Sequence, residues 1–278
     1  MSTGSTALTI RSPALDLDAG IVPWDTESFG VPVAQVWSIT VRDPRSAASD
    51  LAPLAQWLAD GQVRLAACRL PHDGLAESFA LEAVGFRFVE MVYGMRFRLD
   101  PALAPASEAL SAAEEPMAWE TARIEDLARL QAMAADAFVT GRWNVDPRVG
   151  PALGGRRYAD WVARSFDETR HQLLAARVGG ALAGFFIVED KADGSTYWHL
   201  TAVAQGFQGR GIGRRMWASM LARHAAAGRR CVETTISARN IPVVNLYARS
   251  GWTFASNQMT FHWAHPDWTA RDRAGDGR

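Results

Sequence analysis

The sequence predicts an α+β protein built as two halves, and two observations predict it. From residue 118 onward, strand patterns and amphipathic helix patterns alternate in the order β-α-α-β-β-β-α-β-α-β, which favours a mixed, mostly antiparallel sheet flanked by helices. Ahead of this half, residues 101–116 are rich in Ala, Pro, Ser and Glu, which is typical of a linker. We therefore expect a smaller α/β domain over 1–100, a linker over 101–116, a second domain over 117–265 and a flexible tail over 266–278.

The composition excludes several classes of protein. Hydrophobic residues make up 48% and charged residues 21%, as in folded globular chains, and the net charge of -1 gives no general attraction for nucleic acid or anionic membranes. Cys68 and Cys231 are too few for a disulfide scaffold or a cysteine-rich zinc module. The first residues lack a signal-peptide pattern, and no apolar run is long enough to span a bilayer. We expect a cytoplasmic protein without nucleic-acid or membrane partners.

The first elements of the second half follow from periodicity and turn residues. Residues 118–138 read as a short strand and then a helix, whose apolar side chains recur at helical spacing. A polar and aromatic stretch over 139–166 reads as a loop that becomes helical towards its end. Residues 171–190 read as a hairpin, because Gly179-Gly180 forms a two-residue turn between two apolar runs. A third antiparallel strand follows over 195–203.

The remaining elements begin with a glycine-rich stretch that opens a helix. The predicted apolar face of this helix is formed by Ile212, Met216, Met220 and Leu221. Gly228 is a suitable residue just past its end. A strand over 229–237 comes next, then a short helix with Pro242 in its first turn, and a last aromatic-rich strand.

The first half contains a faint echo of the second at a constant offset of 166 residues. Tyr247, Gly251, Trp252 and Phe254 fall on Leu81, Gly85, Phe86 and Phe88 at this offset. The same offset places the glycine stretch on residues 42–47, which contain no glycine. The echo is compatible with an internal duplication that lacks the glycine loop, and equally with coincidence.

The glycine stretch "QGFQGRGIGRRM" over 205–216 does not match two familiar phosphate-binding motifs. The dinucleotide pattern G-x-G-x-x-G fails whether it starts at Gly209 or at Gly211, and too few residues follow for a dinucleotide domain. A P-loop requires Gly-Lys-Ser/Thr, whereas this stretch has Gly213 followed by two arginines. A glycine-rich start of a helix remains, where backbone N–H groups can bind a phosphate.

In this context the sequence resembles the GNAT superfamily of N-acetyltransferases, whose acetyl-CoA loop reads Q/R-x-x-G-x-G/A. Gln208, Gly211 and Gly213 match that pattern, and "NIPVVNLYARSGW" resembles the family's later Asn and Leu-Tyr segment. The resemblance covers residues 118–264. It implies a GNAT fold, preceded by a degenerate GNAT-like domain, and acetyl-CoA as co-substrate. The cofactor-binding residues that it implies are Ala202, Val203, Gln208, Gly209, Arg210, Gly211, Ile212, Gly213, Arg214 and Asn240.

The same resemblance suggests catalytic roles for an acetyl transfer to an amine, by direct transfer without a covalent intermediate. Tyr247 matches the tyrosine that protonates the leaving thiolate, and this role is favoured over that of a core tyrosine on the same helix. His199 is a candidate base, with a water chain as the alternative, because strand alternation places Tyr197, His199, Thr201 and Val203 on one face. His262 and His265 read as a strand end at the surface, and no metal site is expected.

Two further segments resemble the TDP-fucosamine acetyltransferase family, which implies a nucleotide-linked amino sugar as acceptor. They are "VPWDTESFGVPVAQV" over 22–36 and "GRWNVDPRVGPALGGRRYADWVARSF" over 141–166. Arg142, Trp143 and Asp146 are the expected substrate-binding residues, while the alternative is a lid whose tryptophan packs inward. Asp25 is expected to cap a turn, with Trp24 and Phe29 buried between the halves.

The acceptor itself stays open at this point. Antibiotic, polyamine and peptide N-terminal amines are alternatives to the amino sugar, and a non-catalytic acyl-CoA sensor is an alternative to an enzyme. The sequence does not fix the oligomeric state, a homodimer included.

Overall fold

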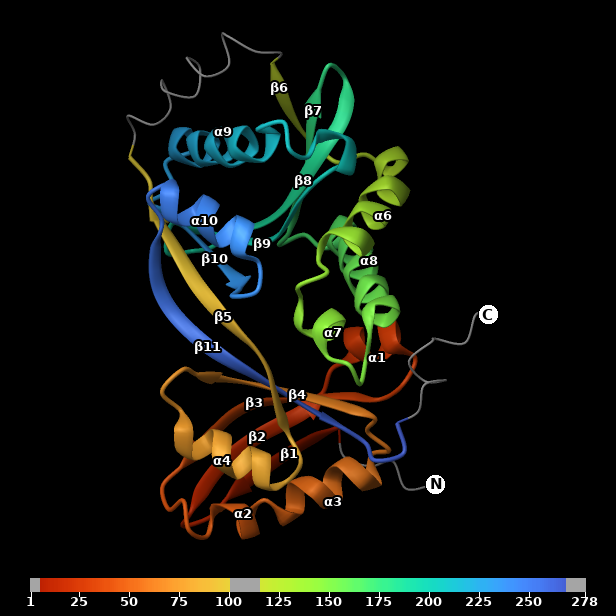
Figure 1. The fold of residues 1–278 in the computed structure, drawn as a ribbon, viewed down its shortest axis with the longest axis vertical. Coiled ribbons are helices and arrows are strands. Elements are labelled where there is room, and N and C mark those ends of the chain that lie inside the picture. The colour runs from red at the N-terminus through yellow and green to blue at the C-terminus, as the bar shows by residue number, and fades with distance from the viewer. Residues whose placement is uncertain (1–5, 101–115, 269–278) are drawn as a thin grey trace.

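A computed structural model of the chain describes residues 6–100 and 116–268. In these residues eleven strands form one continuous sheet in the order β1-β2-β3-β4-β11-β5-β10-β9-β8-β7-β6. Figure 1 shows two bodies connected by the long strands β5 and β11, which run from one body to the other. The predicted linker over 101–116 lies almost wholly outside the described residues.

The N-terminal half is a small α/β unit. Its elements are β1 (Ala7–Arg11), β2 (Leu15–Ile21), α1 (Pro23–Phe29), β3 (Val33–Val41), α2 (Ala47–Asp50), α3 (Ala52–Asp60), β4 (Leu65–Pro71), α4 (Leu75–Ala83) and β5 (Arg87–Arg98). Strands β1 to β3 are antiparallel, and β3 pairs with β4 in parallel. Helices α2, α3 and α4 lie on the side of this sheet away from the second body (Figure 1).

The C-terminal half follows the predicted element order and adds one short helix. Its elements are β6 (Met117–Thr121), the 3₁₀ turn η1 (Ile124–Asp126), α6 (Leu127–Ala137), α7 (Arg142–Val145), α8 (Pro151–Asp167), β7 (Gln172–Val178), β8 (Ala181–Asp190), β9 (Ser195–Val203), η2 (Gln205–Phe207), α9 (Ile212–Ala226), β10 (Cys231–Ser237), α10 (Ile241–Arg249) and β11 (Thr253–Ala264). The predicted hairpin turn is confirmed, because Gly179 and Gly180 both have positive φ, at 56° and 75°. Gly228 likewise follows the end of α9 with φ 72°.

The two halves exchange their last strands. Strand β5 leaves the N-terminal half and pairs with β10, while β11 returns from the C-terminal half and pairs with β4. The two exchanged strands pair with each other between these contacts. The halves therefore form one sheet through backbone hydrogen bonds as well as through side-chain contacts.

The exchange is symmetric in sequence. Adding 166 to the bounds of β4, α4 and β5 gives the bounds of β10, α10 and β11. This agreement of three consecutive elements supports the interpretation of residues 1–100 as a degenerate copy, which stays a prediction.

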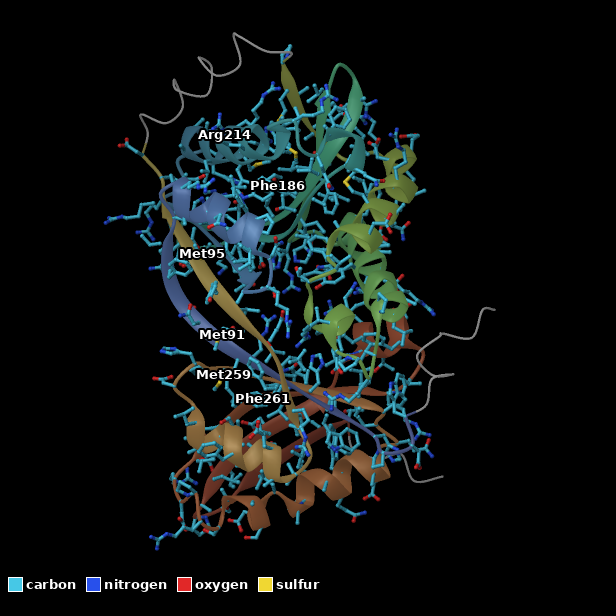
Figure 2. All side chains as sticks on the ribbon, in the orientation of Figure 1. Met91, Met95, Phe186, Arg214, Met259 and Phe261 are labelled. Atoms are coloured by element: carbon cyan, nitrogen blue, oxygen red, sulfur yellow. The ribbon has the colours of Figure 1, made fainter. Side chains whose placement is uncertain are left out.

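Each exchanged strand contributes to the packing of a core. Met91 of β5 packs against the N-terminal core. Met95, four residues further along the same strand, belongs to the C-terminal core with Phe186. Met259 and Phe261 of β11 lie in the N-terminal core. Figure 2 shows the three methionines and Phe261 along the two long strands, with Phe186 on β8. Separating the halves would expose apolar side chains on both strands.

A third apolar cluster joins the halves at α1 and α7. Phe29 and Trp143 contact edge to face, with ring centroids 5.1 Å apart. Beside them the Nε of Arg157 on α8 donates to Asp25 of α1 at 2.7 Å, so Asp25 forms a buried ion pair and does not cap a turn. Trp24 is 44% exposed, and its expected burial is wrong.

The chain end is also better packed than the sequence predicts. Trp268, which belongs to the expected flexible tail, is buried in the cluster at α1 and α7. Its indole Nε1 donates to the carbonyl oxygen of Arg148 at 2.5 Å. The tail prediction therefore starts too early in the sequence, and residues after 268 lie outside the described part of the chain.

Among the described residues, no helix combines the length and the apolar character needed to cross a membrane.

Candidate active site

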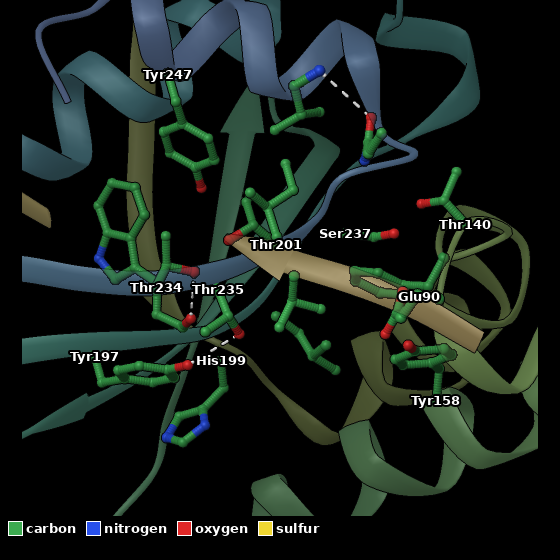
Figure 3. A pocket seen from close by; sticks show the side chains of 18 of the residues that line it. Glu90, Thr140, Tyr158, Tyr197, His199, Thr201, Thr234, Thr235, Ser237 and Tyr247 are labelled. Carbon is green, nitrogen blue, oxygen red and sulfur yellow. Dashed lines mark hydrogen bonds between the residues drawn. The ribbon is translucent and has the colours of Figure 1, made fainter. Parts of the chain in front are cut away.

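A cavity of about 240 Å³ opens where β9 and β10 part. The two strands pair only from Ser195–Trp198 and Cys231–Thr234, and beyond these residues the sheet splays. Side chains from both halves line the cavity (Figure 3). They are Arg69, Glu90, Val92, Phe138, Thr140, Gly141, Tyr158, Trp161, Tyr197, Trp198, His199, Leu200, Thr201, Trp217, Thr234, Thr235, Ile236, Ser237, Asn240, Val243 and Tyr247.

Tyr247 of α10 lies on the wall of this cavity, and Figure 3 shows its hydroxyl directed towards the interior. Its ring packs edge to face on Trp252, with centroids 4.6 Å apart. Burial raises the pKa of Tyr247 to about 12, and the nearby polar groups of Trp217 and Thr234 oppose this shift. The phenol is therefore protonated at neutral pH and able to donate.

His199 of β9 lines the opposite part of the cavity with a carboxylate beside it. The Nε2 of His199 lies 2.8 Å from Oε2 of Glu189 on β8. Burial lowers the pKa of His199, although the hydrogen bond to Glu189 opposes this effect. The pKa of Glu189 is itself lowered by His199, in spite of partial burial. An ionised Glu189 accepts the Nε2 proton and leaves Nδ1 of a neutral imidazole free to accept another.

A β-bulge corrects the predicted face of β9. Trp198 pairs with Val188 and Leu200 pairs with Ile187, so His199 is the extra residue. The bulge shifts the alternation by one position beyond His199. Leu200 and Ala202 therefore pack in the core cluster of α6 and α8, whereas Trp198 and Val203 pack in that of α9. The expectation that His199 and Val203 share a face is wrong for this reason.

The glycine loop between β9 and α9 has the backbone conformation that glycine favours. Gly209 and Gly211 have φ of 72° and 76°, and added Cβ atoms there would meet no atom within 4 Å. The amide side chain of Gln208 closes the loop by donating to the carbonyl oxygen of Val203 at 3.0 Å. Arg214 lies in the first turn of the helix that follows.

The start of α9 offers backbone donors. Gly211 is the N-cap, and the N–H of Arg215 is the first that bonds back, to the Gly211 carbonyl oxygen at 3.2 Å. The N–H groups of Ile212, Gly213 and Arg214 precede this bond, and the helix dipole places partial positive charge on them. The loop and the helix start together fit a diphosphate group. Arg210 adds a guanidinium to this loop, stacked over Phe207 at 5.6 Å from the ring centroid.

Asn240 lies at the start of α10 and lines the cavity. Its side-chain oxygen accepts from the N–H of Val243 at 3.4 Å and caps the helix, which holds the amide in a fixed position. The same helix carries Tyr247, so the cap also fixes the position of the phenol.

In the part of the chain that the structure describes, one group of side chains could hold a metal ion. Ligand atoms of His171, Glu189 and His199 all lie within 4.8 Å of one another. The Nδ1 of His171 already lies 2.8 Å from Glu168, and His199 is bonded to Glu189. These existing hydrogen bonds supply partners for the three side chains without an ion, and we retain the prediction that no metal is used.

None of the three residues expected to bind substrate is among those that line the cavity. Trp143 is 0% exposed and stacks on His262, with ring centroids 3.9 Å apart, so the lid packs inward. Asp146 bonds Nδ1 of His262 at 2.9 Å and the guanidinium of Arg148 at 2.8 Å. His262 is fully buried in this cluster, and its expected place at the surface is wrong.

Arg142 lies over the Trp143 ring, with its guanidinium carbon 4.8 Å from the centroid. Burial and the nearby Arg69 and Arg157 lower the pKa of Arg142 to about 9. Arg142 is therefore the one of the three expected substrate residues whose charge still acts near the cavity.

Among the cavity residues that the sequence analysis missed are two ionisable ones from the N-terminal half. Arg69 lies on β4 and Glu90 on β5. Burial raises the pKa of Glu90, which is opposed by a hydrogen bond from Ser237 and then by Arg69. No sequence motif surrounds either residue. They were missed because only the strand exchange brings β4 and β5 to this site.

Comparison with known families and structures agrees with the fold. Residues 156–265 match the model of the acetyltransferase (GNAT) domain. A GCN5-related N-acetyltransferase from Sphaerobacter thermophilus has a TM-score of 0.61 at 15% identity, over 95% of this chain and 82% of that one. A tandem GNAT protein from the clavulanic acid biosynthesis pathway has a TM-score of 0.57 at 15% identity, over 93% and 83%.

A curated relative matches by sequence over a shorter stretch. It is the spore coat polysaccharide biosynthesis protein SpsD of Bacillus subtilis (strain 168), 22% identical over 130 residues. The match covers 47% of this chain and 45% of that protein, so the chain aligns with less than half of its relative.

Proposed function

Residues 156–265 of this acyltransferase form a GNAT acetyltransferase domain, and from that premise we propose that the chain transfers an acetyl group from acetyl-CoA to the primary amine of a small molecule. The observation that carries the proposal is the arrangement of the cavity. It places a protonated phenol and a carboxylate-bonded imidazole on facing walls, and β9, which lines the cavity as far as Thr201, leads into a glycine loop that fits a diphosphate. A cytoplasmic location and a homodimer stay predictions.

Acetyl-CoA supplies the acetyl group as a thioester when it is bound. For that role the chain offers the residues predicted to bind the cofactor, from Gln208 to Arg214, with the N–H groups at the start of α9 for the diphosphate. Asn240 lines the cavity, and the predicted segment Ala202–Val203 follows the lining residue Thr201 at the end of β9. Arg214 and Arg210 add positive charge for phosphate groups.

The two titratable side chains divide the proton transfers. His199 accepts the proton that the attacking amine loses, at Nδ1, because Nε2 is engaged by Glu189. Tyr247 donates its phenolic proton to the sulfur as the bond between carbonyl carbon and sulfur breaks. The amine nitrogen forms the new amide bond directly, so the reaction requires no covalent intermediate on the protein.

The finer identity of the acceptor is also a proposal. We favour an amino sugar, with a nucleotide-linked one as the candidate that the resemblance of residues 22–36 and 141–166 supports. The name of the curated relative refers to polysaccharide biosynthesis, which agrees with a sugar acceptor. The structural neighbours show the fold alone and leave the acceptor open.

Release of free thiol from acetyl-CoA in the presence of a panel of amines tests the function. We expect thiol release with at least one amine and a loss of about 100-fold in kcat for Tyr247→Phe, the loss typical of removing a positioned proton donor. Tyr93→Phe is the matched control, because Tyr93 packs on Phe254 outside the cavity. Coenzyme A binding without thiol release for any amine would instead favour a sensor. Unchanged turnover of Tyr247→Phe would remove the phenol from the mechanism.

A further inference from the structure

The end of the cavity remote from Tyr247 is built by residues that the proposed acetyl transfer does not use. Arg69 on β4 and Glu90 on β5 both pair in register with Thr260 of β11. Residues in register across antiparallel strands point to the same face of a sheet, so the guanidinium and the carboxyl group lie on one face in one row. Both residues line the cavity.

Glu90 has unused hydrogen-bonding capacity in a dry place. It is 3% exposed, and within the described residues its Oε2 has no hydrogen-bond partner. The nearby hydroxyl of Ser237 lowers the pKa of the carboxyl group, against the effect of burial. Figure 3 shows the hydroxyl of Tyr158 next to Glu90, with Thr140 across the cavity. A buried acceptor atom without a partner is costly, so a ligand that donates a hydrogen bond there gains affinity.

The same end combines these oxygen atoms with aromatic faces. The ring of Tyr158 stacks on that of Phe138, with centroids 4.6 Å apart, and Trp161 also lines the cavity. Hydroxyl and carboxylate oxygens beside apolar rings suit a ligand that has hydroxyl groups at its edge and C–H groups on its faces. A carbohydrate has both.

The charges at this end of the cavity disfavour a ligand that carries an additional positive charge. Arg69, Arg142 and Arg239 all act electrostatically on Glu90, so three guanidinium groups surround one carboxyl group. Neither Arg69 nor Arg142 forms an ion pair with a carboxylate among the residues that the structure describes. A polyamine would bring a further positive charge to this place, whereas a phosphate or carboxylate would bring the charge that is missing.

We propose that the N-terminal half forms an acceptor subsite for a hydroxylated amine that carries an anionic group, in which Glu90 binds hydroxyl groups and Arg69 binds the anion. This proposal rests on the proposed function, because it names the class of amine that the same cavity acetylates. It gives the N-terminal half a role in substrate recognition, which its degenerate sequence does not indicate.

Three acceptors compared on the full-length protein test the subsite: glucosamine 6-phosphate, glucosamine and spermidine. We expect kcat/KM to be at least about tenfold higher for the phosphorylated sugar than for glucosamine, and lowest for spermidine. Arg69→Gln should abolish the advantage of the phosphate, so that kcat/KM for glucosamine 6-phosphate falls to that for glucosamine. Glu90→Gln should raise KM for both sugars about tenfold. Arg45→Gln and Glu82→Gln, at exposed positions of the same half, are the controls.

Coenzyme A affinity of each variant separates a lost subsite from a lost fold, because the subsite does not touch the glycine loop. Equal use of spermidine and the sugars, or an unchanged phosphate advantage in Arg69→Gln, would overturn the proposal. If no amine releases thiol, the proposed function fails, and titration of tryptophan fluorescence with glucosamine 6-phosphate decides on the subsite alone. Saturable binding that Arg69→Gln abolishes would support it, and absence of binding would overturn it.

Discussion

The imidazole Nε2 of His199 lies 2.8 Å from Oε2 of Glu189, and this hydrogen bond sets the protonation of the proposed base. Burial lowers the pKa of His199 and the Glu189 carboxylate opposes the shift. A base must be neutral to act, so kcat/KM should rise with pH through the pKa of His199, below 6.5. In Glu189→Gln the opposing charge is lost, and we expect the acidic limb to move to lower pH and the plateau to fall.

Glu168→Gln is the control for this pH profile, because Glu168 bonds His171 and does not bond His199. Its acidic limb should coincide with that of the unmodified protein. A limb that stays in place in Glu189→Gln would assign the pH dependence to another group. Activity that survives in His199→Ala would favour a water chain as base.

Gly211 and Gly206 offer a matched pair in the proposed cofactor loop. Both have open space at the position of a Cβ atom, but only Gly211 has positive φ, at 76°. Gly211→Ala forces an L-residue into this region at a cost of about 1–2 kcal/mol, which should weaken coenzyme A binding about tenfold or more. Gly206→Ala should bind as the unmodified protein does. Isothermal titration calorimetry with coenzyme A measures both, and equal affinities would show that the loop conformation does not govern binding.

The conformation of the glycine loop could be predicted from the sequence because its determinants are local. Positive φ at Gly209 and Gly211 and the helix that begins after them are written in a few consecutive residues. The same holds for the Gly179-Gly180 turn, which is specified by the two glycines and by the strands directly before and after them.

The acceptor side could not be predicted, because it depends on contacts between distant segments. Glu90 reaches the cavity only through the pairing of β5 with β10, and His262 reaches Trp143 only through the pairing of β11 with β4. The bulge at His199 is a third example, since one extra residue in β9 reverses the faces that alternation predicts. The inward packing of Trp143 follows from the pairing of β11 with β4, because β11 provides the His262 ring on which Trp143 stacks.

The ion pair between Asp25 and Arg157 should be important for holding the halves together. Both side chains are nearly buried, and the Nε of Arg157 lies 2.7 Å from Asp25. Asp25→Asn leaves a buried guanidinium without its charge partner, which we expect to cost about 3 kcal/mol of unfolding free energy. Urea unfolding followed by tryptophan fluorescence measures it. Asp16→Asn, which removes the exposed pair with Arg42, should leave the midpoint nearly unchanged, and equal effects of the two variants would contradict the prediction.

His262 should make the stability of the protein depend on pH in mildly acidic solution. It is fully buried, and burial lowers its pKa from 6.5 to about 4 in spite of the hydrogen bond to Asp146. Between pH 6.5 and 4 the unfolded chain therefore binds a proton that the folded chain does not, and the free energy of unfolding decreases as the pH falls. This histidine alone accounts for a decrease of about 3 kcal/mol across the window.

His224 adds a contribution of the same sign, because its pKa is also lowered to about 4. His262→Gln should accordingly flatten the dependence without abolishing it, whereas His72→Gln, at an exposed position, should preserve the full slope. Urea unfolding at a series of pH values measures these slopes. The slopes are compared, and not the free energies of unfolding themselves, because His262→Gln also loses the contacts to Asp146 and Trp143. An unaltered slope in His262→Gln would mean that this imidazole exchanges protons with solvent in the folded protein, and the buried Asp146–His262 pair would then have to open in the native state.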